Sequence, residues 1–309
     1  MARPQYRRRA RHPRRPVLFR HASGYSGPAM SEDLIPHNNP IGICSWTLGL
    51  DHDLAALMRE CVGLGLQGLQ FSGDHRRHRA ADLRTAAADH GLQLFAIDPF
   101  DCAPDYPNNA SADAAIDYYR RVIDFAAEAG APWTTLQGLG QWMHNCHDAS
   151  AAWQRLVCCC TALHEYAAAR GVALVYEVVN RYETPIIRTA DEGERLRVAL
   201  GGASIGLILD SFHMNIDEPD PQGTLRACAP ELASYHISDS NRGGIGSGHI
   251  DFSAQRDILA RTGFSGPVMI EIVLAENAPV TPPRNQAQWA ALRIEIGRSL
   301  HFWRSAQVA

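Results

Sequence analysis

The chain contains no lysine, and all 29 of its basic residues are arginine. A Schiff-base aldolase and a pyridoxal enzyme both need a lysine amine, so these two mechanisms are excluded. A phosphate-binding loop of the Walker A type also needs its lysine and is excluded for the same reason. Three large enzyme classes are therefore removed before any motif is considered.

Long apolar runs are missing as well. No stretch of about 18 apolar residues is present, which is the length that a membrane-spanning helix needs. No apolar segment of the secretory type follows the basic N-terminus. The eight cysteines lack the repeated C-x₂-C spacing of a structural zinc site. We therefore expect a cytoplasmic protein with reduced thiols and no membrane partner.

Charge is distributed unevenly along the chain. Residues 1–20 carry eight arginines and no acid, whereas residues 41–309 hold 21 arginines against 31 acidic residues. An acidic body repels a phosphate backbone, so no nucleic-acid partner is expected. Residues 1–39 have no apolar period and are predicted to form a disordered, Arg-rich N-terminal tail. An arm that binds an anionic surface and a transit peptide are the alternatives for this segment.

From residue 41 onward, apolar runs alternate with helix signals in eight units. Most units start about 25 to 40 residues apart, the length of a right-handed βαβ crossover. The runs are continuously apolar, as parallel strands buried on both faces are. No glycine-rich nucleotide turn follows the first run, which argues against an open doubly wound sheet. We predict an α/β fold, a single-domain (β/α)8 TIM barrel over residues 40–309.

The element boundaries follow from the runs and from the caps that flank them. The predicted strands cover residues 41–45, 66–71, 92–97, 133–137, 172–177, 205–210, 232–238 and 267–273. The predicted helices end near residues 64, 90, 130, 170, 200, 229, 262 and 305. Ser111 is expected to cap the third helix, and Gly130 suits the position after its end.

Four successive runs in the second half each close on a side chain that can bind a divalent cation. These residues are Glu177, Asp210, His236 and Glu271. In a β/α barrel the carboxyl ends of the strands converge on one mouth, where active sites lie. An acid at one strand end is often only a helix cap, and one histidine is often a core residue. Four such residues on neighbouring strands instead predict a metal site.

The ligand set restricts the metal. Three carboxylates and one imidazole form a hard, oxygen-rich sphere that suits Mn²⁺, with Mg²⁺ or Co²⁺ as alternatives, better than zinc bound by sulfur. Such an ion with four protein ligands keeps two open positions, which adjacent oxygens of a hydroxyketone could fill. We therefore expect one divalent cation and a small-molecule substrate.

Three motifs surround these ligands: EVVNRYE at 177–183, DSFHMNI at 210–216 and HISDSNRG at 236–243. They resemble the motifs of the xylose-isomerase-like TIM barrels, and within them of the ketose 3-epimerases (D-tagatose and D-psicose 3-epimerases). The resemblance covers residues 41–275 in outline and is strong over residues 172–271. It implies metal ligation by Glu177, Asp210, His236 and Glu271, and substrate contacts from Glu183, His213 and Arg242.

The resemblance also implies a reaction. A ketose 3-epimerase inverts C3 of a free ketose through a metal-bound cis-enediolate. Glu177 and Glu271 would serve as the acid/base pair, one taking the C3 proton and the other returning one. Relatives are commonly dimers or tetramers, so a homo-oligomer is expected. The segment LQGLGQWMHN and the loop LAENAPVTPPRNQ differ from the family pattern, which leaves the identity of the monosaccharide open.

Several alternatives remain at this point. Another isomerase of the same barrel, of the aldose–ketose, hydroxypyruvate or inosose type, would share the metal and the enediolate. A phosphorylated substrate is an alternative because Gly243, Gly244, Gly246 and Gly248 could form an anion-binding loop. An apurinic-site endonuclease needs more histidines, but the first four strand ends offer Ser45, Ser72, Asp98 and Gln137. A binding protein without activity is the last alternative.

Overall fold

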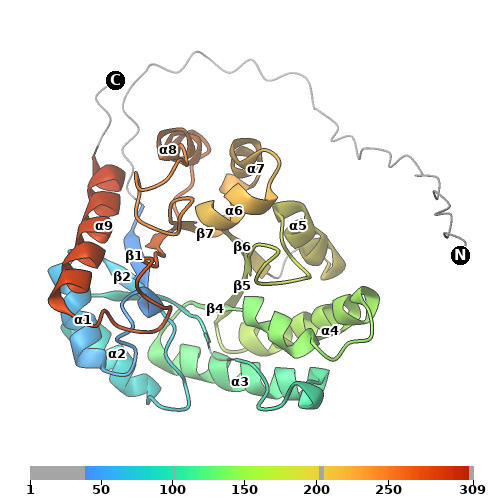
Figure 1. Ribbon diagram of the computed structural model, residues 1–309. Coiled ribbons are helices and arrows are strands. Elements are labelled where there is room, and N and C mark those ends of the chain that lie inside the picture. The colour runs from blue at the N-terminus through green and yellow to red at the C-terminus, as the bar shows by residue number, and fades with distance from the viewer. Residues whose placement is uncertain (1–38, 101, 202–204, 306–309) are drawn as a thin grey trace, which may run out of the picture. The chain divides into compact units, whose positions relative to one another are not determined.

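The computed structural model describes residues 39–100, 102–201 and 205–305. Eight parallel strands close into a barrel in chain order, as predicted, and helices form a ring outside them (Figure 1). The strands are β1 Ile41–Cys44, β2 Gly68–Phe71, β3 Gln93–Ile97, β4 Trp133–Thr135, β5 Ala173–Val178, β6 Ile205–Asp210, β7 Leu232–Ile237 and β8 Val268–Ile270.

The helices follow the strands with one addition to the prediction. They are α1 Leu54–Gly63, α2 Ala80–Asp89, α3 Ala112–Ala129, α4 Ala149–Ala168, α5 Ala190–Ala199, α6 Ser211–Asp217, α7 Pro221–Cys228, α8 Phe252–Arg261 and α9 Gln286–Arg304. Short 3₁₀ turns are η1 Ser45–Thr47, η2 Pro107–Asn109, η3 Gln137–Met143 and η4 Ala229–Glu231. None of the helices described is long and apolar enough to cross a bilayer.

The helix ends show why these segments form helices. Ser111 caps α3 by accepting a hydrogen bond from the amide of Ala114, and Gly130 ends it with a left-handed φ of 79°. Asp53 and Asp148 cap α1 and α4 in the same way. Both features predicted for α3 are confirmed.

Helix α6 was not predicted. Its seven residues make fewer than two turns, and its apolar residues Phe212, Met214 and Ile216 alternate as they would in a strand. The Asp210 side chain caps this helix by accepting from the Phe212 amide at 2.6 Å. One carboxylate therefore ends β6 and starts α6, which fixes its position at the mouth.

The inside of the barrel is filled by side chains. Cys44, Phe95 and Met269 pack there in one buried cluster with Trp46. Gly42 makes this packing fit, because a Cβ at that position would come within 2.9 Å of the Met269 side chain. The inside of the barrel is thus a packed core.

The tail predicted for residues 1–39 lies, apart from Asn39, outside the described residues. Asn39 is buried, and its amide donates to the carbonyls of Phe264 and Gly266 at 3.0 and 2.9 Å. These two bonds attach the start of the barrel to the turn before β8. Asn39, which the sequence analysis places in the tail, is thus packed against the barrel.

Candidate metal centre and active site

The four predicted ligands meet at the mouth of the barrel. One ligand atom from each of Glu177, Asp210, His236 and Glu271 lies within 4.8 Å of those of the other three, and all four residues are buried. The His236 Nδ1 atom is 2.6 Å from Glu271 Oε2 and 3.2 Å from Glu177 Oε1. The convergence of these strand ends, which the sequence predicts, is therefore present in the structure.

Strand register explains this convergence. Asp210 at the end of β6 pairs directly with His236 on β7. Glu177 lies one residue before the end of β5, and Glu271 directly follows β8, with its amide bonded to the carbonyl of Ile237 at 3.1 Å. Adjacent parallel strands in near-equal register place their last residues at one level, so the four side chains share one layer.

The cluster carries an excess of negative charge. Three carboxylates face a single fixed cation, Arg242, which leaves a net charge of about −2 when His236 is neutral. Burial and the neighbouring Glu177 raise the pKa of Glu271 to about 8. Burial opposes protonation of His236, but Glu177 and Glu271 outweigh it and raise its pKa well above the usual value. A divalent cation would balance this negative charge.

The donor set suits a metal. His236 Nε2 is buried and has no hydrogen-bond partner among the described residues, which is costly for a polar atom. Burial raises the pKa of Asp210, yet Arg242, His213 and His236 outweigh burial and bring it to about 2. Asp210 is therefore a permanent carboxylate. The residues present fit a hard divalent cation, in agreement with the sequence-based expectation.

Arg242 lies beside the ligands, where the third motif places it. Its guanidinium donates to Asp210 Oδ2 at 2.7 Å and to Glu271 Oε1 at 3.0 Å. The Phe212 and Trp46 rings flank it, with centroids 4.7 and 5.8 Å away. Its backbone has a φ of 65°, a conformation uncommon for a residue other than glycine. This local conformation turns the side chain back over the barrel mouth.

His213 and Glu183 are held by Asn180. The Asn180 side-chain amide donates to His213 Nδ1 at 2.7 Å and to Glu183 Oε1 at 3.3 Å. Because Nδ1 accepts, the imidazole proton is on Nε2, which lies 3.9 Å from Glu177 Oε1. Burial lowers the pKa of His213 to about 3, so the ring is neutral. All three residues predicted to contact substrate therefore lie around the four candidate metal ligands.

A second polar group on β2–β4 was not predicted as a unit. Asp98 is buried and accepts hydrogen bonds from Gln70, Thr135 and Gln137 at 3.1, 2.5 and 2.8 Å. The Gln137 amide also donates to Glu177 Oε2 at 3.3 Å. The sequence places Asp98 and Gln137 at the ends of two strands but does not indicate that the two side chains interact. The signal that could have found the group is the polar residue within each short apolar run.

Cys44 lies at the same centre, because its Sγ atom and one ligand atom each of His236 and Glu271 lie within 4.8 Å of one another. Burial, Glu271 and Glu177 raise the pKa of its thiol well above the usual value. A thiol that keeps its proton is a poor metal ligand, so Cys44 acts as a packing residue here. All eight cysteines are free, as the sequence predicts.

The glycine-rich loop does not offer free amides to a phosphate. The Gly246 amide donates to Asp239 Oδ2 at 2.9 Å, and the Gly244 amide donates to Glu295 Oε2 at 3.0 Å. The Gly243 amide is bonded to the Asn241 side chain at 3.0 Å. Carboxylates of the protein thus occupy the positions that an anion would take, and the anion-loop alternative loses its support.

Among the described residues, two groups of three or more potential ligands converge, and both contain His236 and Glu271. A separate cluster with further histidines, as the endonuclease alternative requires, is not found in this part of the chain. The structure thus provides one centre, at the strand ends of β5–β8.

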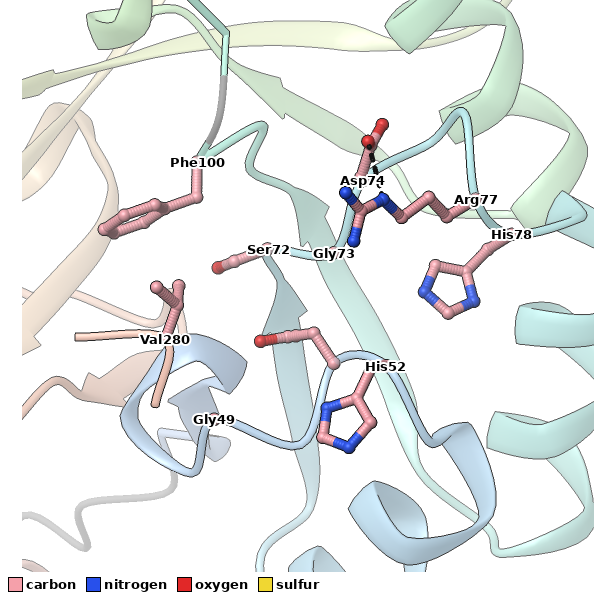
Figure 2. Close-up of a pocket in the computed structure, with 10 residues that line it drawn as sticks. Gly49, His52, Ser72, Gly73, Asp74, Arg77, His78, Phe100 and Val280 are labelled. Atoms are coloured by element: carbon pink, nitrogen blue, oxygen red, sulfur yellow. Dashed lines mark ion pairs between the residues drawn. The ribbon is translucent and has the colours of Figure 1, made fainter. Parts of the chain in front are cut away.

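A cavity of about 420 Å³ opens beside this centre, over the ends of β1–β3. Figure 2 shows Phe100 and Val280 on one side of it and Asp74, Arg77 and His78 on the other. Ser72 lies between the two sides (Figure 2). The mouth of the barrel therefore has one arc with the four candidate metal ligands and a second, hollow arc.

Comparisons with known proteins agree with this description. The model of the family described as xylose isomerase-like TIM barrel matches residues 58–294. The chain is 35% identical to an L-ribulose 3-epimerase of Mesorhizobium japonicum, over 45% of this chain and 47% of that protein. It is 31% identical to a ketose 3-epimerase of Arthrobacter globiformis, over 72% of this chain and 73% of that protein.

A solved structure of an L-ribulose 3-epimerase superposes with a TM-score of 0.72 at 26% identity, covering 85% of this chain and 92% of that one. In sequence, however, the chain matches only about half the length of the first relative and nearly three quarters of the second. The shared architecture therefore extends further than the aligned sequence.

Proposed function

Since this chain belongs to the xylose isomerase-like TIM barrel family, and to the ketose 3-epimerases within it, we propose that it is a sugar isomerase that inverts C3 of a free ketose. The observation that carries the proposal is the meeting of Glu177, Asp210, His236 and Glu271 within 4.8 Å. Its relatives bear the names of 3-epimerases, which gives the reaction class.

The four ligands would hold one divalent cation, and we propose Mn²⁺, with Mg²⁺ or Co²⁺ as alternatives. Such an ion, when bound, supplies Lewis-acid stabilisation of the negative charge that develops on the sugar oxygens. Asp210, a permanent carboxylate, serves as ligand and as helix cap but takes no part in proton transfer.

Proton transfer falls to Glu177 and Glu271. They come from β5 and β8, three strands apart around the ring, so their carboxylates can approach a bound sugar from two sides. Inversion needs one group to remove the C3 proton and another to return one on the opposite face. A positioned carboxylate contributes about 10²–10⁴ in rate.

Arg242, His213 and Glu183 would orient the oxygens near the carbonyl. Arg242 is buried except for 16% of its side chain, and its charge is fixed by Asp210 and Glu271. His213 presents its Nε2 proton as a donor, because Asn180 occupies Nδ1. Glu183, in the loop over the mouth, has a half-exposed side chain and would accept a hydrogen bond from a substrate hydroxyl. These donors and acceptors are held in place before a substrate binds.

The test is a substrate panel with metal-stripped protein that is reloaded with Mn²⁺. D-fructose, D-tagatose and hydroxypyruvate are incubated in ²H₂O, and NMR identifies the product and the carbon that gains deuterium. Deuterium at C3 of an inverted ketose supports the proposal. Deuterium at another carbon, or an aldose product, assigns the protein to a different isomerase of the family.

Two variants test the roles of the glutamates. Glu177→Gln and Glu271→Gln are each expected to lower turnover by about 10²-fold or more, because each loses a base and a metal ligand. Glu165→Gln on the exposed face of α4 is the matched control and should keep full turnover. A binding protein without activity would show no turnover in any of the three.

The remaining expectations belong to the same proposal. Eight free cysteines agree with a cytoplasmic location, where thiols stay reduced. We also propose a homo-oligomer, a dimer or a tetramer, which light scattering after size-exclusion chromatography measures directly.

A further inference from the structure

A buried carboxylate lies on the side of the barrel mouth that carries none of the four proposed metal ligands. Asp98 directly follows β3, and only 5% of the residue is exposed. Its carboxylate accepts hydrogen bonds from four uncharged side chains, which are Gln70, Ser72, Thr135 and Gln137. A buried charge is costly even when hydrogen bonds surround it, so we expect a function for Asp98 beyond packing.

Gln137 connects Asp98 to the proposed acid/base residue Glu177. Its Nε2 atom donates to Asp98 Oδ1 at 2.8 Å and to Glu177 Oε2 at 3.3 Å. A side-chain amide has two N–H groups, so each carboxylate can take one of them. The Oε1 atom of Gln137 is buried and has no hydrogen-bond partner among the described residues. Two carboxylates, which only accept hydrogen bonds when ionised, therefore determine the orientation of this amide.

Strand register brings Gln137 and Glu177 together. Thr135 at the end of β4 pairs with Val175 on β5. The Leu136 amide donates to the carbonyl of Val175 at 2.9 Å, so the two segments stay in register as far as Gln137. Gln137 follows Thr135 by the same number of residues as Glu177 follows Val175, which places both side chains at one level of the barrel. Their contact is therefore a consequence of the strand pairing.

The two oxygens of Glu177 have different surroundings as a result. Oε2 accepts the hydrogen bond from Gln137, whereas Oε1 lies 3.2 Å from Nδ1 of the neighbouring ligand His236. One oxygen is thus held by a side chain of the protein. The other is directed at the place where the four proposed ligands converge.

Glu271, the second proposed acid/base residue, is held by different groups. Its Oε1 atom accepts from the Arg242 guanidinium at 3.0 Å, and its Oε2 atom lies 2.6 Å from His236 Nδ1. A fixed cation therefore orients Glu271, whereas a neutral amide orients Glu177. Since a neutral amide can turn over and present its oxygen instead, it needs a further group to fix its orientation, and Asp98 is in the position to do so.

We infer that Gln137 and Asp98 are positioning residues for Glu177. Gln137 holds Glu177 Oε2 so that Oε1 is presented to the centre, and Asp98 acts through Gln137 by fixing the orientation of its amide. The inference rests on the proposed function for the role of Glu177 in proton transfer. Neither positioning residue belongs to the three motifs that carry the family resemblance.

Gln137→Met removes the amide and keeps a side chain of similar length. Mn²⁺ affinity, measured by titration calorimetry, should fall about tenfold, because the groups that orient metal ligands are typically worth about 10–100-fold. At saturating Mn²⁺, kcat for the ketose should fall about tenfold while KM changes less than about threefold, since Gln137 supports the base and not the substrate. Gln141→Met, in the same 3₁₀ turn, is the matched control and should behave as the wild type.

A double-mutant cycle tests whether Asp98 acts through Gln137. Asp98→Asn should lower kcat and Mn²⁺ affinity as Gln137→Met does, because an uncharged partner no longer fixes the amide. The double variant should then match Gln137→Met alone to within about twofold. Losses that multiply would show a separate structural role and overturn the assignment of Asp98. Asp105→Asn, at an exposed position in the loop after β3, is the matched control.

NMR of the Gln137 side-chain amide tests the contacts without metal or substrate. In ¹⁵N-glutamine-labelled protein in EDTA, the two amide-proton resonances are assigned by their loss in Gln137→Met. Asp98→Asn and Glu177→Gln should each shift mainly a different one of the two, because each carboxylate accepts one hydrogen. Resonances that neither substitution moves would overturn the inference. If Asp98→Asn does not fold, as its melting curve would show, the results for Gln137→Met and Glu177→Gln decide.

The outcomes separate this inference from the proposed function. If Gln137→Met keeps the Mn²⁺ affinity and kcat of the wild type, the positioning role is wrong and the proposed reaction stands. A higher KM with unchanged kcat would make Gln137 a substrate contact and also overturns the role. If the wild type converts no ketose, the proposed reaction is wrong, and the Mn²⁺ affinities and amide resonances still decide whether this pair holds Glu177.

Discussion

Binding of Mn²⁺ should raise the melting temperature of this protein by an amount that can be calculated from the number of described residues. A ligand that binds the native state adds about 2.7 kcal/mol at a concentration of 100 Kd, and about 1.4 kcal/mol for each further tenfold increase. Unfolding entropy is about 2.1 cal/mol/K per residue, or about 0.5 kcal/mol/K for the roughly 260 described residues. The melting temperature should therefore rise by about 5 °C at 100 Kd and by about 3 °C per further decade.

Asp210→Asn tests whether this gain comes from the proposed centre. The substitution removes one of four ligands and leaves a shape of similar size, and its amide oxygen can still cap α6. Without its carboxylate the cluster should bind Mn²⁺ at least tenfold more weakly, so the melting curve should shift only at correspondingly higher concentrations. Differential scanning calorimetry with EDTA and with a series of Mn²⁺ concentrations measures how the melting temperature depends on Mn²⁺ concentration in the wild type and in Asp210→Asn.

The control and the refuting result are clear. Glu165→Gln, on the exposed face of α4, should reproduce the wild-type series. If the melting temperature of the wild type does not depend on Mn²⁺, or if Asp210→Asn responds at the same concentrations, the four strand ends do not form the binding site. Weak binding to exposed histidines would affect all three proteins equally.

Three further predictions concern pH and stability. Mn²⁺ affinity should rise with pH up to at least about 8, because the ion must displace protons from His236 and from Glu271, whose pKa is raised to about 8. Calorimetry in two buffers of different ionisation enthalpy counts the protons that are released on binding. An Mn²⁺ affinity that does not change between pH 6 and 9 would contradict this prediction. Burial lowers the pKa of His213 to about 3, so on acidification the unfolded chain binds a proton at this residue before the folded protein does, and the free energy of unfolding falls as pH drops below about 6.5. Between pH 7 and 5 in EDTA, the free energy of unfolding of the wild type should fall by about 2 kcal/mol more than that of His213→Gln, as measured by urea titration. Equal losses in the two proteins would refute the assignment. Asn39→Ala should lower the free energy of unfolding by about 1–3 kcal/mol, because the Phe264 and Gly266 carbonyls lose their donor; an unchanged urea midpoint would mean that water replaces the amide.

The sequence predicts the ring of strands and the convergence of Glu177, Asp210, His236 and Glu271, for a definite reason. Asp210 and His236 each end an apolar run, and parallel strands in register bring such ends together without further information. Glu177 and Glu271 follow the same rule. The pattern that reveals the strands therefore also reveals the ligands.

The hollow arc is less visible in the sequence. Gln70, Thr135 and Gln137 come from three short runs, and nothing local indicates that all three donate to Asp98. Their meeting depends on closure of the barrel. Likewise the two ion pairs of Arg242 depend on a left-handed backbone conformation that a single sequence does not display.

The loop after β7 is held from a distance by α9. Glu295 and Ser299 of this helix accept hydrogen bonds from the amides of Gly244 and Ile245, both at 3.0 Å. Arg242 stands two residues ahead of Gly244 in that loop. During synthesis on a ribosome, this loop therefore lacks its bonds to α9 until residue 299 has left the exit tunnel. Nascent chains halted before that point would carry every proposed metal ligand and still lack the two bonds that tie this loop to α9.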